Sequence, residues 1–105
     1  MSYMIEISKD CQKYLFKLDK KQRQLIQNWI TQHLQGCLNP RQYGKKLVGE
    51  LKDYWAYRIG NYRIVCLIDD ENQAVQIIGI GHRSDIYLKM VHEEEMIYGI
   101  EKEAI

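Results

Sequence analysis

The spacing of apolar side chains in the first third of this chain predicts one strand followed by two helices. The stretch YMIEIS, residues 3–8, alternates apolar and polar side chains, as expected of a strand with one face in a core. Apolar residues then recur at helical spacing, which predicts amphipathic helices over 9–18 and 20–34 that meet near Asp19. Gly36 is a typical residue to end the second helix.

Alternation returns in the second half of the chain and predicts three consecutive strands. YWAYRIG (54–60) and NYRIVCLID (61–69) form two strands joined at Gly60-Asn61, a pair suited to the positive φ angles of a tight hairpin turn. QAVQIIGIG (73–81) follows a short polar turn and suits a buried strand. Before these strands, residues 36–50 hold the single proline and three glycines, and predict a long irregular loop.

This order of elements predicts an α+β domain. The N-terminal strand and the three-stranded meander would form an antiparallel sheet, with the helix pair packed on one side of it. After Gly81, Ser84 stands in a helix-capping position, and the apolar residues Ile86 and Met90 predict a C-terminal helix that frays by Gly99.

Length and composition indicate one folded domain over residues 1–105. The chain is 46% hydrophobic and 28% charged with a single proline, which is ordinary for a globular domain and excludes a disordered or collagen-like chain. No apolar run approaches the roughly 18 residues that span a bilayer, and the N-terminus lacks the apolar core of a secretory signal. We therefore expect a cytoplasmic protein that does not contact a membrane.

Cysteine usage and charge narrow the possible chemistry. Cys11, Cys37 and Cys66 are scattered, without CxxC spacing or a paired His/Cys arrangement, so we expect reduced thiols, no metal and no cofactor. Residues 1–90 hold 14 Lys and Arg against 9 Asp and Glu, whereas residues 91–105 hold one Lys against five Glu. A moderately basic body, compatible with a polyanionic partner, thus ends in an acidic stretch. That stretch is either a solvated helix or a cover for the basic face.

Two arginines face each other across the predicted hairpin. If the turn centres on Gly60-Asn61, Arg58 lies opposite Arg63 on the neighbouring strand. Like charges directly across a sheet repel unless an anion lies between them or solvent screens them, so the pair indicates an anion site. The alternative is that both side chains point to water and cover apolar surface.

Further candidate groups follow the third strand. His82 and Arg83 stand at its end and Tyr87 lies about one helical turn beyond, where rigid scaffolds commonly display functional groups. Convergence of these residues with the arginines on one sheet face would suit cleavage of RNA by its own 2′-hydroxyl. That reaction needs a proton acceptor, positive charge for the phosphorane and an acid for the leaving 5′-oxygen. Taken singly, each residue also fits an ordinary surface or packing role.

The segment KKLVGELKDYWAYRIGNYRIVCLIDDENQAVQIIGIGHRSDIY, residues 45–87, resembles the core of the RelE/ParE superfamily of bacterial toxins from toxin-antitoxin modules. Its pattern is L-x-G, then Y/W-x-x-R-x-G-x-Y-R-I-x-Y/C-x-I-D, then V-G-H-R-x-x-V-Y. The N-terminal strand and helix pair agree in length and order, so the resemblance extends to about Met90. It implies a RelE-like fold. The RelE branch cleaves messenger RNA in the ribosomal A site, and the ParE branch inhibits DNA gyrase.

The resemblance also assigns roles to the candidate residues. Arg58 matches the second of a basic pair and Arg63 the arginine of a Y-R motif, and both would stabilise the phosphate and the transition state. Arg83, or His82 if the loop is aligned one residue differently, matches an arginine after the last strand that would add a phosphate contact. Tyr87 matches the tyrosine of the final helix, which would orient the substrate or assist the acid.

One position departs from the RelE pattern. Ala56 stands where the RelE pattern has the first member of the basic pair. A lysine at that position would match the residue that is assigned as the base in the RelE pattern. Relatives in the superfamily use histidine for acid-base work, so His82 is the candidate to replace that lysine as base or acid.

The leading interpretation is a ribosome-dependent, metal-independent endoribonuclease toxin, an mRNA interferase that inhibits translation. Its partners would be messenger RNA on the ribosome, with contacts to ribosomal RNA, and a cognate antitoxin. Operator DNA would be reached only through the antitoxin complex. Two alternatives stay open, a ParE-like gyrase inhibitor without nuclease activity and a degenerate member that acts with its antitoxin as a co-repressor.

Overall fold

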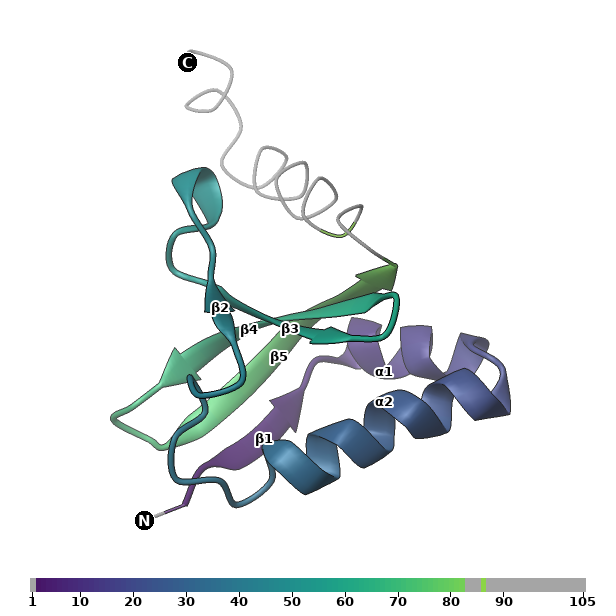
Figure 1. Ribbon diagram of the computed structural model, residues 1–105, viewed down its shortest axis with the longest axis horizontal. Helices are drawn as coiled ribbons and strands as arrows, with labels where there is room; N and C mark the ends of the chain where they lie inside the picture. Colours follow the sequence, from purple (N-terminus) through teal and green to yellow (C-terminus); the bar gives the residue numbers. More distant parts are fainter. Residues whose placement is uncertain (1, 83–85, 87–105) are drawn as a thin grey trace.

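The computed structural model describes residues 2–82 and 86, and shows a helix pair packed on one side of a five-stranded sheet (Figure 1). The elements in chain order are β1 (Met4–Ile7), α1 (Lys9–Lys17), α2 (Lys20–His33), β2 (Lys45–Lys46), the 3-10 helix η1 (Gly49–Leu51), β3 (Trp55–Ile59), β4 (Tyr62–Asp69) and β5 (Ala74–His82). The predicted strands and helices within this range are confirmed to within one residue at each end. Apart from Ile86, the predicted C-terminal helix and the acidic stretch lie outside the described residues.

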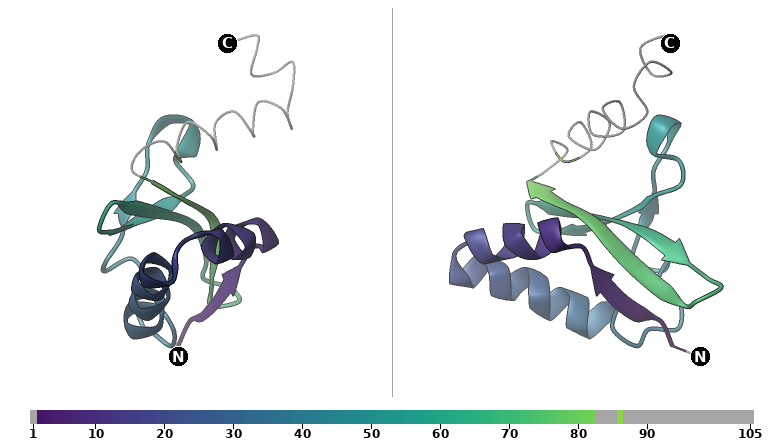
Figure 2. Two further views of the ribbon diagram at one scale, coloured as in Figure 1. Left: turned by 90° about the vertical axis from the view of Figure 1, so that its right-hand side faces the viewer. Right: turned by 180° about the vertical axis from the view of Figure 1, so that it is seen from behind.

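Side-chain caps fix where the two helices begin. The Ser8 hydroxyl oxygen accepts a hydrogen bond from the Cys11 amide at 3.2 Å, and the Asp19 carboxylate accepts one from the Gln22 amide at 2.9 Å. Each bond satisfies one of the free amides in a first helical turn. Asp19 thereby separates the two helices, which lie side by side along the sheet (Figure 2).

The sheet is mixed rather than antiparallel. Its order is β1-β5-β4-β3-β2, and β3, β4 and β5 form the predicted antiparallel meander, but β1 pairs in parallel with β5. The antiparallel direction predicted for β1 is wrong because no hairpin joins β1 to β5. The helix pair and the meander connect them, and a long crossover permits parallel pairing. At the opposite edge, β2 lies within the loop predicted over 36–50.

Alternation along the strands divides the apolar side chains between two faces. On the helix side, a large cluster joins both helices to buried sheet residues such as Tyr57 and Ile64. The other side, which we call the open face, carries a smaller cluster built on Leu51, Val65 and Ile86. The open face therefore combines a limited apolar patch with room for polar groups.

Polar contacts anchor the loop between α2 and β2. The buried Tyr57 hydroxyl donates a hydrogen bond to the Pro40 carbonyl at 2.6 Å, and burial raises the pKa of this hydroxyl. The Arg41 guanidinium pairs with both carboxylate oxygens of Asp70, with N–O distances of 2.8 and 3.0 Å, and the Tyr3 hydroxyl donates to the same carboxylate at 2.7 Å. These contacts hold the approach to β2 against the rest of the sheet.

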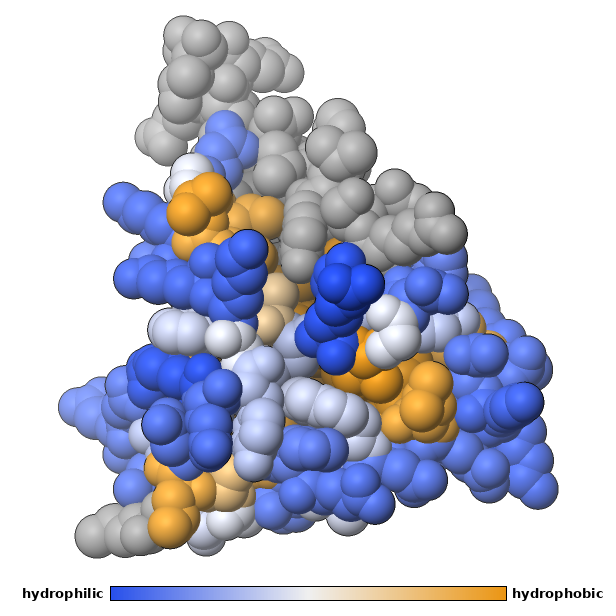
Figure 3. Space-filling model, in the orientation of Figure 1, coloured by the Kyte–Doolittle hydropathy of each residue, from blue (hydrophilic) through white to orange (hydrophobic). Residues whose placement is uncertain are grey.

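Neither a membrane span nor a metal site is found in the described part of the chain. No helix there is long and apolar enough to cross a bilayer, and no group of three or more His, Cys, Asp or Glu side chains is placed to hold a metal ion. None of the three cysteines, all of which lie in the described part of the chain, forms a disulfide, and burial raises the pKa of Cys66 to about 12. Figure 3 shows apolar surface in separate patches between hydrophilic side chains.

The hairpin between β3 and β4 turns at Gly60, whose φ is +57°. Among the described non-glycine residues only Gln73 has a positive φ, so Asn61 does not adopt the left-handed conformation predicted for it. A positive φ at the first central residue alone is the pattern of a type II′ turn, in which glycine is required once rather than twice.

We expect Gly60→Ala to lower the free energy of unfolding by about 1 to 2 kcal/mol, because an L-residue is strained at this φ. A Cβ atom here would lie 3.8 Å from the Leu25 side chain, an ordinary contact, so the cost is backbone strain and not a clash. Urea denaturation measures it. Asn61→Ala is the matched control and should cost less than about 0.5 kcal/mol; equal losses at both positions would contradict the type II′ assignment.

The Arg41–Asp70 pair predicts a pH-dependent part of the stability. Hydrogen bonds, first from Arg41 and then from Tyr3, lower the pKa of Asp70 from its ordinary 3.8 to about 2. A carboxyl with a lowered folded-state pKa stabilises the fold above its unfolded pKa, and the contribution disappears as the pH falls through the folded value.

We expect Asp70→Asn to lower Tm by about 1 to 4 °C at pH 7, because the pair is solvent-exposed and screened. The difference from the wild type should shrink between pH 4 and pH 2. Thermal denaturation followed by circular dichroism tests this, with Glu71→Gln as a control that removes a neighbouring carboxylate outside the network. A difference that stays constant down to pH 2 would rule out the carboxylate as its source.

Candidate functional site

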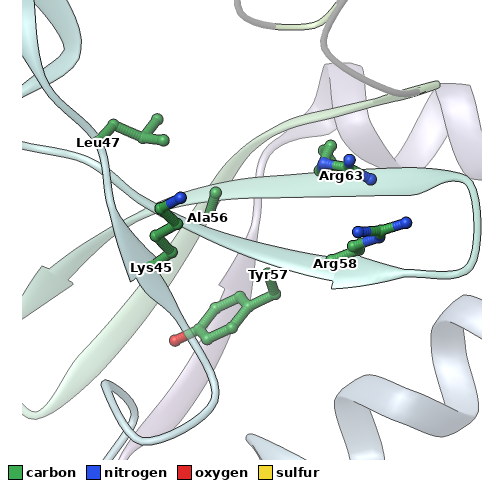
Figure 4. Close-up of a pocket in the computed structure, with 6 residues that line it drawn as sticks. All are labelled: Lys45, Leu47, Ala56, Tyr57, Arg58 and Arg63. Carbon is green, nitrogen blue, oxygen red and sulfur yellow. The ribbon is translucent and has the colours of Figure 1, made fainter.

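The predicted opposition of two arginines is confirmed. Arg58 of β3 pairs directly with Arg63 of β4, so the two side chains leave the sheet on the same face. Their neighbours along the strands pack into the helix-side core, which places both arginines on the open face. Figure 4 shows the two guanidinium groups side by side above the hairpin.

A shallow pocket of about 290 Å³ lies beside this pair on the open face. Its lining residues are Lys45, Leu47, Ala56, Tyr57, Arg58 and Arg63. Three of these side chains are cationic, and none of the described lining residues is acidic. The pocket is therefore suited to a small anion or to one phosphate of a longer polyanion.

Arg63 is the best-placed group for such an anion. Its side chain is partly buried, and its Nη1 atom is shielded from solvent without a hydrogen-bond partner among the described residues. A buried donor left unsatisfied costs about 1 to 3 kcal/mol, and more when it is charged. Arg58 is exposed, so solvent screens its charge more strongly. The orphan nitrogen of Arg63 indicates that the site is completed by an acceptor from another molecule or from residues outside the described range.

His82 does not join the arginines. It ends β5 opposite Tyr62, its ring packs edge-on against the Tyr62 ring at 5.3 Å between centroids, and Tyr62 belongs to the helix-side cluster. The predicted convergence of His82 with Arg58 and Arg63 on one face is therefore wrong.

A β-bulge explains the difference. The pairing of β4 with β5 shifts between Val65 and Cys66, which face Gly79 and Ile77, so that Ile78 is an extra residue on β5. An extra residue inverts the alternation beyond it. Without the bulge, His82 would have shared a face with Arg63.

The position that does face Arg63 from β5 is Gly81. A Cβ atom on Gly81 would lie 2.7 Å from the Cβ of Ile86, so the absence of a side chain lets Ile86 pack closely over the strand. Ile86 belongs to the open-face cluster with Val65. Arg83 and Tyr87, the other two predicted site residues, lie outside the described residues.

Lys45 lines the pocket, although sequence analysis assigned it no role. It was predicted to lie in the irregular loop, but it forms β2 with Lys46 and stands opposite Ala56 of β3. A strand of two residues has too few positions to display a period, so alternation could not have identified it. The useful signal was that the family-like segment begins at Lys45.

A family model described as "ParE toxin of type II toxin-antitoxin system, parDE" matches residues 5–87. Two toxins of Mycobacterium tuberculosis strain H37Rv are also similar. Toxin RelG is 44% identical over 48 residues, which are 46% of this chain and 55% of RelG. Toxin RelE is 43% identical over 49 residues, which are 47% of this chain and 50% of RelE. The chain thus matches about half the length of each of these relatives.

Solved structures share the fold. The toxin-antitoxin complex RelBE2 of M. tuberculosis contains a chain with a TM-score of 0.71 and 27% identity, over 80% of this chain and 94% of that chain. A free mutant of the E. coli toxin RelE gives a TM-score of 0.65 at 19% identity, over 89% of this chain and 98% of that chain, which is a likeness of fold alone. The RelE-like fold is confirmed, and the match of the family model from β1 to beyond β5 establishes that this chain belongs to the ParE toxin family of type II toxin-antitoxin systems, within the RelE/ParE superfamily.

Proposed function

We propose that this protein is a toxin that cleaves messenger RNA in the A site of the ribosome without a metal ion and so stops translation in the cytoplasm. The observation that carries the proposal is the opposed pair Arg58 and Arg63 on the open face, with a buried nitrogen on Arg63 that has no hydrogen-bond partner in the described part of the chain. A cationic pocket that is incomplete among the described residues suits a phosphodiester. The similarity to toxins named RelG and RelE favours the RelE-like branch.

In the proposed reaction the 2′-hydroxyl gives its proton to a base as its oxygen attacks the adjacent phosphorus. A 2′,3′-cyclic phosphate forms, and the P–O5′ bond breaks as the leaving 5′-oxygen takes a proton from an acid. Arg63 and Arg58 hold the phosphate and neutralise the charge that develops on its oxygens. Arg83 would add a phosphate contact, and Tyr87 would orient the substrate or assist the acid, as the resemblance implies. His82 is not given the proton-transfer role, because its ring lies against Tyr62 on the other face of the sheet.

We further propose that a cognate antitoxin binds this toxin and blocks its site. The RelBE2 complex of M. tuberculosis and the RelBE complex of E. coli are toxin-antitoxin complexes of proteins with this fold. Contact with operator DNA would then be indirect, through the antitoxin.

A second candidate function is inhibition of DNA gyrase without nuclease activity. Two observations favour it: the matching family is described as ParE toxin, and Ala56 stands where the RelE pattern has a lysine. The arginines would then contact a protein surface. The shared fold does not choose between the two targets.

Mapping of new messenger RNA 5′ ends in a reconstituted translation reaction separates the two functions. We expect cuts within the A-site codon when ribosomes are present and intact message when they are omitted. The same preparation is added to a gyrase supercoiling reaction as the comparison. Intact message together with lost supercoiling would replace the nuclease proposal with the gyrase one.

We expect Arg63→Ala to slow cleavage on programmed ribosomes by about 10² to 10³-fold, the usual loss for one oxyanion-binding donor. Arg58→Ala should lose less, about tenfold, because its exposed charge is screened. Arg23→Ala is a matched control that removes the same charge from α2, where the guanidinium lies over the Phe16 ring. It should leave the rate unchanged.

The stability of the same variants distinguishes a binding role from a structural one. Removing one of two opposed cations relieves repulsion, so Arg63→Ala should leave the free energy of unfolding unchanged or raise it by up to about 1 kcal/mol. If the variant instead loses cleavage and stability together, Arg63 would be a structural residue and the proposal would lose its main support.

A further inference from the structure

We propose that Lys45 is the third cation of this site and binds the same phosphate as Arg58 and Arg63. This inference deepens the proposed function and rests on it. In the RelE pattern a lysine is expected within β3, at the position of Ala56. In this chain the ammonium group of Lys45 would reach the substrate from the neighbouring strand β2.

The strand pairing determines which of the two lysines of β2 reaches the pocket. Lys45 stands opposite Ala56, and Lys46 stands opposite Trp55. Residues directly opposite each other in a sheet share a face. Trp55 packs against the helix-side cluster, so Lys46 is directed to that side, whereas Lys45 shares the open face with Ala56.

The close-up view agrees with this assignment. Figure 4 shows the Lys45 side chain rising beside Ala56, on the same side of the sheet as Arg58 and Arg63, while the Tyr57 ring projects to the opposite side. Ala56 is buried, with 6% of its surface exposed, and lines the pocket together with the lysine. A methyl group at position 56 leaves the space above β3 free for a side chain from β2.

Local contacts hold the backbone of Lys45 in place although its side chain is exposed. The Leu47 amide donates to the Tyr54 carbonyl at 3.0 Å just after β2, and the Gly44 amide donates to the Arg41 carbonyl at 3.2 Å just before it. The Tyr57–Pro40 and Arg41–Asp70 contacts anchor the preceding loop. These contacts fix the backbone position from which the Lys45 side chain lines the pocket.

The charge balance explains why a third cation suits this place. A phosphodiester carries one negative charge, and the phosphorane formed during cleavage carries about one more, so positive charge beyond one guanidinium is more strongly attracted to the transition state than to the substrate. A lysine contributes a compact charge with rotatable donors and needs no bidentate geometry, so it can reach the phosphate from a neighbouring strand.

The test exchanges the lysine between the two strands. Lys45→Ala should slow cleavage on programmed ribosomes by about 10² -fold, and Lys46→Ala, which removes an equally exposed lysine from the other face, should stay within about twofold of the wild type. The double variant Lys45→Ala/Ala56→Lys restores an ammonium to the pocket from β3 and should recover most of the lost rate. The Tm of each variant verifies that it is folded.

A binding measurement tests independently of cleavage whether Lys45 contacts a phosphate. The probe is a short RNA oligonucleotide with 2′-O-methyl groups, which cannot be cut, and its affinity is followed as a function of salt. Each phosphate contact contributes a slope of about −0.7 in log K against log salt for a single strand. Lys45→Ala should therefore reduce the slope by about 0.7, and Lys46→Ala should leave it unchanged.

The outcomes separate the two proposals. If Arg63→Ala slows cleavage as expected while Lys45→Ala stays within twofold of the wild type, the role of Lys45 is overturned and the nuclease function stands. If the wild type does not cleave, the nuclease function fails, and the salt slope decides: a reduced slope in Lys45→Ala supports the phosphate contact, and an unchanged slope overturns it. If Lys45→Ala slows cleavage and the folded double variant does not recover the rate, the idea that Lys45 takes the place of a lysine at position 56 is also overturned.

Discussion

Packing of β3 and β4 against the helices fixes what the open face can present. Because successive strand residues point to opposite sides, burial of Tyr57, Ile59 and Ile64 directs Arg58 and Arg63 away from the core. A slip of one residue would bring both guanidinium groups under the helices, where an unpaired charge costs several kcal/mol. The helix-side core therefore does more than stabilise the sheet, since it keeps two mutually repelling cations together at one point on the surface.

The opposed arginines make this point of the surface favourable for an anion, because a negative charge between them relieves their repulsion. The sheet tolerates the opposed arginines, and Arg63 retains a buried nitrogen without a partner among the described residues. A ligand that binds the folded state alone and supplies the missing acceptor stabilises the fold by its binding free energy. A phosphodiester and the acidic side chain of a protein partner meet this requirement equally well, so the arginine pair favours a negatively charged ligand without indicating which class of molecule carries the charge.

Features set by local rules could be predicted from the sequence, and those set by distant pairing could not. Alternation and the Gly60-Asn61 turn were enough to place Arg58 opposite Arg63. The direction of β1 depends on a partner far along the chain, the strand of two residues at Lys45 is too short to show a period, and no sequence pattern marks the bulge at Ile78. That one extra residue places His82 on the other face, because side chains alternate between the two faces of a sheet only while the strand pairing is regular.

Proton transfer is what distinguishes a nuclease from a binding protein built on this face. Arginine does not lose its proton in proteins, so Arg58 and Arg63 can hold a phosphate but cannot act as base or acid. Of the other described pocket residues, Tyr57 directs its hydroxyl to Pro40 on the helix side, away from the arginine pair. The arginines suit cleavage and binding equally, whereas cleavage also requires one group that takes the proton of the 2′-hydroxyl and another that protonates the leaving 5′-oxygen. The arginine pair alone therefore does not choose between a nuclease and a binding protein.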